Sequence, residues 1–379
     1  MKVVQVNCVF DKGLTDPDDL LGRYTTLTGW SEALLAAGAT NATVVQRFHR
    51  PARFTRNGVE YVFVSDELPP HLRPWQSSLP FAAAVGGLSP DVVHMNGLEF
   101  PAQARRIRSL LPDAAIVVQN HSGGGLVGRA PVLRLLTRAT RSAVDAFLFA
   151  VDEHAESWRR AGAIAPRQRT YTVMPASTTF RLVPRDGARH ASGIAGDPAV
   201  LWVGRLTANK DPLTVLDGFE RCLARLPDAS LTMIYGTDEL LPDVRRRVEE
   251  SNTLRARVRL VGQVAHDRMP AFFSAADVFV VGSHQEGSGY SVIEACACGA
   301  IPVVTRIPSF QQLTADGSIG ALWTPGSAVD CARALVDVAA GDLVTSRAQV
   351  VDHFARALSW PAVGRRAVDV YAEVLKQAR

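Results

Sequence analysis

The stretch GSHQEGSGYSVIEACACGAIPVVT, residues 282–305, has the pattern of a loop, a helix and a strand in succession. It follows a β-branched run at 277–281, and its last residues, Gly299–Thr305, again have the composition of a strand. Glu286 lies on the loop, whereas Glu294 lies about one turn inside the helix. Placed in this way, the two carboxylates can bind different parts of one elongated ligand. The structural alternative puts Glu286 on a loop surface and Glu294 in a helix cap or a salt bridge.

The start of that helix is a natural place for phosphate groups. Ser288 can cap the helix, and the N–H groups of Gly289–Ser291 then point outward from its positive end. Gly287 adds no side chain that would keep a ligand away from the backbone. We therefore expect phosphates at the helix start, with a sugar beside Glu286 and a ribose beside Glu294.

The rest of the chain repeats the alternation of strands and helices. Short β-branched runs alternate with helical patterns over the 379 residues, which predicts parallel sheets covered by helices on both faces. The length favours two domains. The segment RDGARHASGIAGDPA, rich in Gly, Ala and polar residues, separates two such series and is interpreted as a linker. The expected fold class is α/β with two doubly wound domains, bounded as 1–185 for the first, 186–198 for the linker, 199–355 for the second and 356–379 for a C-terminal helix.

A second motif, LWVGRLTANKDP, lies at the exit of the second domain's first strand. The strand Ala199–Val203 is followed by Gly204, where a ligand can approach the backbone closely. Arg205 and Lys210 come next and place two cations where a diphosphate could be bound. The structural alternative is an exposed surface loop with ordinary charges.

Together, the two motifs resemble the nucleotide-sugar site of GT-B fold glycosyltransferases, in particular the retaining family 4 group. One mark of that group is an E-x7-E element, here EGSGYSVIE, with the strand GAIPVVT after it. Another is Gly-Arg-Leu with a downstream Lys, here GRLTANK. The resemblance implies two Rossmann-like domains that face a cleft, the acceptor side first and the nucleotide-sugar-binding domain second. It also implies that the C-terminal stretch SWPAVGRRAVDVYAEVL returns to the first domain as a helix.

The resemblance also assigns roles to individual residues. Glu286 would contact hydroxyls of the donor sugar, and Glu294 would hold the ribose of the nucleotide. Arg205 and Lys210 would bind the diphosphate. His121, which follows a strand of the first domain, would contact the donor sugar or the reacting oxygens, and a structural histidine is the alternative. Further ligand contacts are expected at Gly204, Gly287, Ser288, Gly289, Tyr290, Gln263 and Val264.

Composition limits the partners of this chain. The 41 basic and 37 acidic residues give a net charge of +4, which does not indicate nucleic-acid binding. The five cysteines show no metal-ligand spacing, and Asp16 and Asp18, which mimic a metal-binding D-x-D, are interpreted as a turn and a helix start. No apolar run approaches the length of a membrane helix. The N-terminus lacks the features of a signal peptide, so the expected location is cytoplasmic.

Two other features leave alternatives open. Arg134, Arg138 and Arg141 share one helical stripe, which indicates either a solvated face or contact with an anionic acceptor or lipid surface. His94 lies at the end of an earlier strand and is a second, less favoured histidine candidate.

We therefore expect a metal-independent enzyme that transfers a sugar from a nucleoside-diphosphate sugar to an acceptor hydroxyl with retention of configuration. We expect no cofactor beyond this donor. The expected partners are a small-molecule donor and a small-molecule acceptor, not nucleic acid, and contact with a membrane is the less favoured alternative. A nucleotide-sugar epimerase on the same fold and a non-catalytic sugar- or nucleotide-binding protein remain alternatives. The intact set of Glu286, Glu294, Arg205 and Lys210 argues against the last of these.

Overall fold

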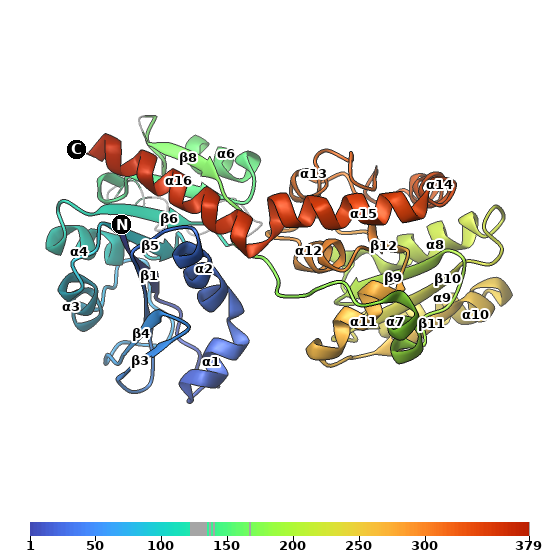
Figure 1. Cartoon of the computed structure of the whole chain (residues 1–379), viewed down its shortest axis with the longest axis horizontal. Helices are drawn as coiled ribbons and strands as arrows, with labels where there is room; N and C mark the ends of the chain where they lie inside the picture. The colour runs from blue at the N-terminus through green and yellow to red at the C-terminus, as the bar shows by residue number, and fades with distance from the viewer. Residues whose placement is uncertain (122–134, 136–137, 139–140, 167, 379) are drawn as a thin grey trace. The chain divides into compact units, whose positions relative to one another are not determined.

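The chain folds into two α/β units, each built around its own sheet (Figure 1). The computed structural model describes residues 1–121, 135, 138, 141–166 and 168–378. The first unit comprises Met1–Ser177 together with Trp360–Arg379, and the second comprises Thr178–Ser359. The expected fold class, α/β with two doubly wound sheets, is confirmed.

The strands of the first unit are β1 (Lys2–Asn7), β2 (Asn41–Arg47), β3 (Ala52–Arg56), β4 (Val59–Val64), β5 (Val92–Asn96), β6 (Ala115–Gln119), β7 (Ala146–Phe149) and β8 (Arg169–Thr172). Among the described residues their order is β3-β4-β2-β1-β5-β6-β7-β8, and all neighbours are parallel except β3 and β4. The β3–β4 hairpin, which sequence analysis missed, turns at Asn57 and Gly58 with φ angles of 52° and 79°. Both residues adopt the left-handed region that a two-residue hairpin turn requires.

The C-terminal helix belongs to the first unit. The helices there are α1 (Pro17–Arg23), α2 (Thr25–Ala36), α3 (Leu79–Gly87), α4 (Pro101–Leu110), α6 (Asp152–Arg160) and α16 (Trp360–Ala378), with a short turn η1 (Arg141–Ala143). Two glycines let α16 approach α2 closely. A Cβ on Gly29 would lie 2.3 Å from the Trp360 indole, and one on Gly364 would lie 2.3 Å from the Ala33 carbonyl oxygen. Any larger side chain at either glycine would push the helices apart.

The second unit has a fully parallel sheet. Its strands are β9 (Ala199–Gly204), β10 (Ser230–Tyr235), β11 (Val258–Gly262), β12 (Val278–Val281), β13 (Ile301–Thr305) and β14 (Ala321–Trp323), in the order β11-β10-β9-β12-β13-β14. The surrounding helices are α7 (Arg185–Ser192), α8 (Pro212–Cys222), α9 (Leu241–Glu249), α10 (Asn252–Arg257), α11 (Met269–Ala275), α12 (Tyr290–Ala297), α13 (Pro308–Leu313), α14 (Ala328–Ala339) and α15 (Leu343–His353). Two 3-10 turns, η2 (Ala208–Lys210) and η3 (His266–Arg268), and one π-helical segment, η4 (Phe354–Leu358), complete the unit's described helical elements.

The segment 186–198 is not the linker between the two units that the sequence led us to expect. Most of that segment is helix α7, which packs against α11 inside the second unit and buries Ala188 completely. Arg185 and Arg189 both pair with Asp277, whose side chain is only 1% exposed. The composition of the segment resembles a loop, but a narrow face of small residues is enough to pack a short helix. The chain passes between the units at 177–178 and 359–360 instead.

Both sheets bury their apolar strand residues on two faces, as doubly wound sheets do. In the first unit, Val6, Val93, Ile116 and Phe149 are among the fully buried core residues. In the second, Trp202 and Trp323 join Val280 and Val303 in the core. The polar residues that follow the strands are therefore concentrated at the carboxyl ends, where ligands of such folds bind. No described helix is long and apolar enough to cross a bilayer.

Candidate functional site

The loops after β9 and β12 are joined by hydrogen bonds between residues about 76 positions apart. The Asn209 Nδ2 donates to the Gln285 carbonyl oxygen at 3.0 Å, and the Gln285 N–H donates back to Asn209 Oδ1 at 3.1 Å. The His284 N–H donates to the Asn209 carbonyl oxygen at 2.9 Å. A Cβ on Gly282 would lie 3.0 Å from the Asp211 carbonyl oxygen, so glycine permits this approach. The two sequence motifs thus form one surface.

Lys210 and Glu286 meet on this surface as an ion pair. The Lys210 Nζ contacts Glu286 Oε1, and their side chains are only 13% and 14% exposed. The Ser283 hydroxyl donates to the same carboxylate oxygen at 2.7 Å. Sequence analysis placed both charges in one ligand site without foreseeing that they pair with each other. A half-buried pair of this kind keeps both charges in place when no ligand neutralises them.

Asp211, the residue after Lys210, uses its carboxylate for other contacts. Its carboxylate accepts from His284 Nε2 at 3.1 Å and from the Thr214 N–H at 3.3 Å, which caps helix α8. Its backbone has φ 44° and ψ 57°, a left-handed conformation that is uncommon outside glycine. The two side-chain contacts hold Asp211 in this conformation, which fixes the loop that carries Lys210.

Arg205 stands apart from these contacts. It directly follows Gly204, the last residue of β9, and is exposed. Within the described ranges its side chain has no acidic or hydrogen-bonding partner. Its guanidinium therefore remains available to an anionic ligand, as a bidentate partner for phosphate oxygens.

Helix α12 begins differently from the expectation. Its N-cap is Gly289, with φ 62° and no side-chain cap, and Ser288 does not occupy that position. A Cβ on Gly289 would lie 2.6 Å from Leu313 Cδ1, so the close packing and the left-handed backbone both require glycine. The Ser309 hydroxyl donates to the Glu286 carbonyl oxygen at 2.6 Å and so fixes the loop before the helix. The helix thus begins without a side-chain cap, and a helix start of this kind is a general position for an anionic ligand.

Glu294 lies inside α12 and is 7% exposed. Its Oε1 accepts from His266 Nε2 at 3.0 Å, and this hydrogen bond raises the pKa of His266 above its ordinary value. His266 begins η3, in the loop after β11 that also carries the exposed Gln263 and the half-buried Val264. Sequence analysis stopped at Val264 and missed His266. The signal was its place in the same strand-exit loop, since such loops supply ligand contacts in parallel sheets.

The first unit contains a separate cavity of about 460 Å³ at the carboxyl ends of β1, β5 and β6. Asn7 and Asn96 end β1 and β5, and His121 follows β6. His121 Nε2 lies 3.0 Å from Asn96 Oδ1. Because a carbonyl oxygen can only accept, this contact puts the proton on Nε2 and leaves Nδ1 as an acceptor. The described lining is Asn7, Val9, Tyr24, Thr26, Leu27, Asn96, Gly97, Glu99, Phe100 and His121.

Two histidines near this cavity are held neutral. Desolvation lowers the pKa of His121 to about 4, although the residue keeps an exposed face. Desolvation also lowers the pKa of His94 to about 3. His94 is fully buried, and its Nδ1 accepts from the Tyr371 hydroxyl of α16 at 2.6 Å. His94 is therefore part of the core, and His121 is the histidine that lines the cavity.

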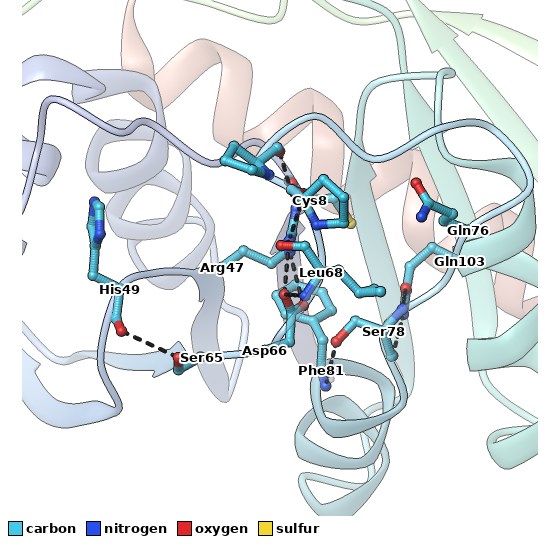
Figure 2. A network of polar contacts seen from close by, with 12 residues as sticks. Cys8, Arg47, His49, Ser65, Asp66, Leu68, Gln76, Ser78, Phe81 and Gln103 are labelled. Carbon is cyan, nitrogen blue, oxygen red and sulfur yellow. Dashed lines mark hydrogen bonds and ion pairs between the residues drawn. The ribbon is translucent and has the colours of Figure 1, made fainter.

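The wall of the cavity beside β1 is fixed by a buried polar network (Figure 2). Arg47, with a side chain 1% exposed, donates to both oxygens of Asp66 at 2.9 and 2.7 Å. It also donates to the carbonyl oxygen of Cys8 at 3.3 Å. The adjacent Gln46 donates to the carbonyl oxygen of Val9 at 2.7 Å. The loop after β1, which contributes Val9 to the cavity, is thus attached to β2 through main-chain acceptors.

Asp16 and the three arginines of the predicted helical stripe are the remaining residues that the sequence analysis singled out. Asp16 caps α1 by accepting from the Asp18 N–H at 2.8 Å, which confirms the turn and helix start. Within the described residues no group of three or more His, Cys, Asp or Glu side chains is arranged to hold a metal ion. Arg134 lies outside the described residues. Arg138 is exposed, and the Arg141 guanidinium donates to the Gly162 carbonyl oxygen at 3.5 Å.

A family model for glycosyl transferases group 1 matches residues 197–340, which include both motifs of the second unit. The chain is 30% identical over 250 residues to D-inositol 3-phosphate glycosyltransferase 2 of Catenulispora acidiphila, covering 62% of this chain and 58% of that protein. It is 26% identical over 314 residues to GDP-mannose:cellobiosyl-diphosphopolyprenol alpha-mannosyltransferase of Xanthomonas campestris, covering 80% of each.

Solved structures extend the likeness over the whole chain. Sucrose-phosphate synthase from Thermosynechococcus elongatus superposes with a TM-score of 0.68 at 19% identity and covers 100% of both chains. Anabaena HepE in complex with UDP gives a TM-score of 0.70 at 15% identity, covering 98% of this chain and 100% of that one. At such identities these structures establish the fold. The chain therefore has the GT-B fold, and its second unit contains a glycosyl transferases group 1 domain.

Proposed function

We propose that this protein transfers a sugar from a nucleoside-diphosphate sugar to an acceptor hydroxyl with retention of configuration. The observation that carries the proposal is the joined surface of the β9 and β12 loops. That surface carries the Lys210–Glu286 ion pair, and the exposed Arg205 lies in the same loop after β9. The β12 loop leads into the start of α12, which has no side-chain cap, and Glu294 lies about one turn inside that helix. The names of two relatives support the donor class, because one uses GDP-mannose and one structure was solved with UDP.

Each group on this surface has a role in donor binding. The guanidinium of Arg205 and the N–H groups at the start of α12 would bind the diphosphate. Lys210 would leave Glu286 and turn to a phosphate oxygen when the donor arrives. Glu286 would then be free to accept hydrogen bonds from the sugar hydroxyls, and Glu294 would accept them from the ribose. Donor binding would thus exchange one internal ion pair for two ligand contacts.

In the proposed chemical step, the sugar moves from the diphosphate to the acceptor oxygen while fixed cations stabilise the leaving diphosphate. The bond between the sugar C1 and the diphosphate oxygen breaks while the acceptor oxygen bonds to C1 on the same face. The acceptor proton passes to the departing phosphate oxygen, so no protein nucleophile is needed. Negative charge grows on the diphosphate as the bond breaks, and fixed cations such as Arg205 and Lys210 stabilise it more in the transition state than in the ground state. His121, with its Nδ1 unprotonated, would accept from a sugar or acceptor hydroxyl in the first unit.

The test starts from the donor, because its nucleotide can be found without knowing the acceptor. A thermal-shift panel of UDP, GDP, ADP and their hexose conjugates should show one nucleotide that raises the melting temperature, since a ligand stabilises the state that binds it. The matching sugar nucleotide is then incubated with candidate acceptors, and NMR of the product reports the anomeric configuration. An α product from an α donor supports the proposal. Inversion, or conversion of the sugar nucleotide without any acceptor, would contradict it.

A further inference from the structure

His266 is the group in contact with Glu294 that the proposed donor-binding scheme leaves without a role. Its Nε2 lies 3.0 Å from Glu294 Oε1. The two side chains differ in exposure, at 71% for His266 and 9% for Glu294. Glu294 comes from helix α12, whereas His266 comes from the loop after β11. The contact therefore joins a nearly buried carboxylate to a loop at the surface.

The imidazole ring is held by packing as well as by the hydrogen bond. The Phe180 ring lies with its centroid 4.7 Å from that of His266, at an interplanar angle of 40°. Phe180 is itself 8% exposed and contacts Phe273 of α11, with ring centroids 6.3 Å apart. The buried Phe180 ring on one side and the carboxylate acceptor at Nε2 orient the His266 ring, while most of its side chain is exposed. The donor atom of His266 thus points toward Glu294 before any ligand arrives.

The hydrogen bond from His266 determines which lone pairs of the Glu294 carboxylate remain available to a ligand. A carboxylate has two oxygens with about four lone-pair directions. His266 occupies one direction on Oε1, and elsewhere in the described chain no side chain or N–H group bonds to the Glu294 carboxylate. The hydrogen bond also stops the carboxyl group from rotating about its terminal torsion, which is otherwise broad. The remaining lone pairs then point in set directions, as two neighbouring hydroxyls of a ribose require.

We propose that His266 is a positioning residue that orients the Glu294 carboxylate for the two vicinal hydroxyls of a ribonucleotide. The inference rests on the proposed binding of ribose by Glu294 and extends it to a residue outside both sequence motifs. His266 itself contacts no substrate in this scheme. Its effect is selectivity for ribose over a sugar that lacks the two hydroxyls. An oriented carboxylate binds two correctly placed hydroxyl donors more tightly than a freely rotating carboxylate does.

The experiment compares two ligands on five proteins and one control variant. The ligands are whichever of UDP, GDP and ADP binds most tightly and the 2′,3′-dideoxy form of the same diphosphate, with dissociation constants from calorimetry. The proteins are the wild type, His266→Ala, His266→Gln, Glu294→Gln and the double variant His266→Ala/Glu294→Gln. His190→Ala, an exposed histidine on α7 of the same unit, is the matched control.

The wild type and the His190→Ala control should prefer the ribose form by about tenfold or more, the range of one or two charge-assisted hydrogen bonds. His266→Ala should lower this preference to about threefold or less while leaving the affinity for the dideoxy form unchanged, which also shows that the variant is folded. His266→Gln should restore most of the preference, because its amide Nε2 can donate to the same oxygen. In the Glu294→Gln background, His266→Ala should change nothing further.

Several results would overturn the inference alone. Glu294→Gln losing the preference while His266→Ala keeps it would show that Glu294 binds ribose without help from His266. Equal losses of affinity for both nucleotides in His266→Ala would indicate a role in loop packing only. A wild-type preference that survives Glu294→Gln, or the absence of binding by any nucleoside diphosphate, would instead refute the proposed function on which the inference rests.

Discussion

The joined loops of the second unit and the cavity of the first unit present different chemistry to a ligand. The second-unit surface is built of charges, with Lys210 paired to Glu286 and Arg205 left exposed. The described lining of the first-unit cavity contains no Lys or Arg. Besides apolar residues it has Glu99, two asparagines, Tyr24, Thr26 and the neutral His121. This difference indicates that one unit is suited to a diphosphate and the other to hydroxyl groups.

The two regions also differ in how their polar groups are satisfied. On the second unit, loop contacts hold the charged side chains in place by pairing them with each other, so a ligand has to exchange partners. In the first unit, Asn96 fixes the proton of His121 and leaves Nδ1 open as an acceptor. The first arrangement would make ligand binding sensitive to charge, whereas the second makes the cavity sensitive to the protonation state of His121.

The largest effect that would sharpen this contrast is expected from Arg205→Ala. Removing a charge-assisted contact to the leaving diphosphate, typically about 1.5–3 kcal/mol, should lower turnover by about 10- to 100-fold. The donor Michaelis constant should rise less, because the contact strengthens as charge develops. The melting temperature should stay within about 1 °C, since Arg205 is exposed and unpaired within the described residues. Steady-state kinetics and a thermal scan measure both effects.

Arg225→Ala is the matched control for this variant, because Arg225 is also exposed in the second unit but follows α8. It should leave turnover unchanged. If Arg205→Ala keeps normal turnover, the diphosphate binds elsewhere and the charged surface has another purpose. Lys210→Ala should also depress turnover, but it removes the cation that Glu286 contacts. The double variant Lys210→Ala/Glu286→Gln separates the loss of phosphate contact from the effect of an unpaired carboxylate.

The second prediction divides the charged surface between its two glutamates. Glu294→Gln should weaken binding of the bare nucleoside diphosphate by about tenfold, because the amide loses one of two hydroxyl acceptors. Glu286→Gln should leave that affinity nearly intact, or raise it slightly by freeing Lys210, while lowering turnover and sugar discrimination. Calorimetry with nucleotide and sugar nucleotide distinguishes the two. Equal losses of nucleotide affinity in both variants would contradict the division of roles.

The sequence predicted the second-unit site better than that of the first unit for a physical reason. Glu286, the start of α12 and Glu294 lie within one loop–helix segment, so their relative positions follow from the helix rise alone. The Lys210–Glu286 pair and the His266–Glu294 contact depend on how strand exits 76 and 28 residues apart are brought together. Residue spacing along the chain contains no such information.

The first unit shows the same limit at the level of the fold. The alternation of strands and helices predicted its parallel sheet but not the antiparallel β3–β4 hairpin at one edge of that sheet. The cavity is assembled from the ends of β1, β5 and β6, and no single segment contains more than part of it. His121 was identified as a candidate, but its hydrogen bond to Asn96 depends on the pairing of β5 with β6.

The third prediction tests the neutral state of the first unit through His94. The folded protein holds the pKa of His94 at about 3, below the ordinary value of 6.5, so the unfolded chain binds a proton that the folded chain does not. Stability is therefore fully present above about pH 6.5 and falls as the pH drops toward 3, by up to about 1.4 kcal/mol for each pH unit. His94→Gln should make this slope shallower in denaturant titrations between pH 7 and 4.

His190→Gln, exposed on α7, is the control for this slope and should reproduce the wild type. His121, whose pKa is also lowered, should leave part of the slope in His94→Gln. The slope is compared rather than absolute stability, because any change at the fully buried His94 alters packing with Tyr371. An unchanged slope in His94→Gln would show that its ring is protonated in the folded state.

The smallest expected effect is that of chelation. If Arg205, Lys210 and the start of α12 neutralise the diphosphate, transfer should continue in excess EDTA at its normal rate. The measurement is turnover with and without chelator, after extensive dialysis. Loss of activity that Mg²⁺ or Mn²⁺ restores would show that a metal ion, rather than these fixed charges, stabilises the leaving group.

The return of α16 to the first unit affects the order in which the chain can fold during synthesis. The second unit is one continuous segment, Thr178–Ser359, and all of it leaves the ribosome before α16 does. The first unit cannot be completed before α16 is synthesised. Tyr371 of this helix supplies the hydroxyl that bonds to His94 and accepts from the Trp30 indole N–H at 3.2 Å. A released chain truncated just before residue 360 should therefore have a protease-resistant second unit while His94 and Trp30 lack their partner.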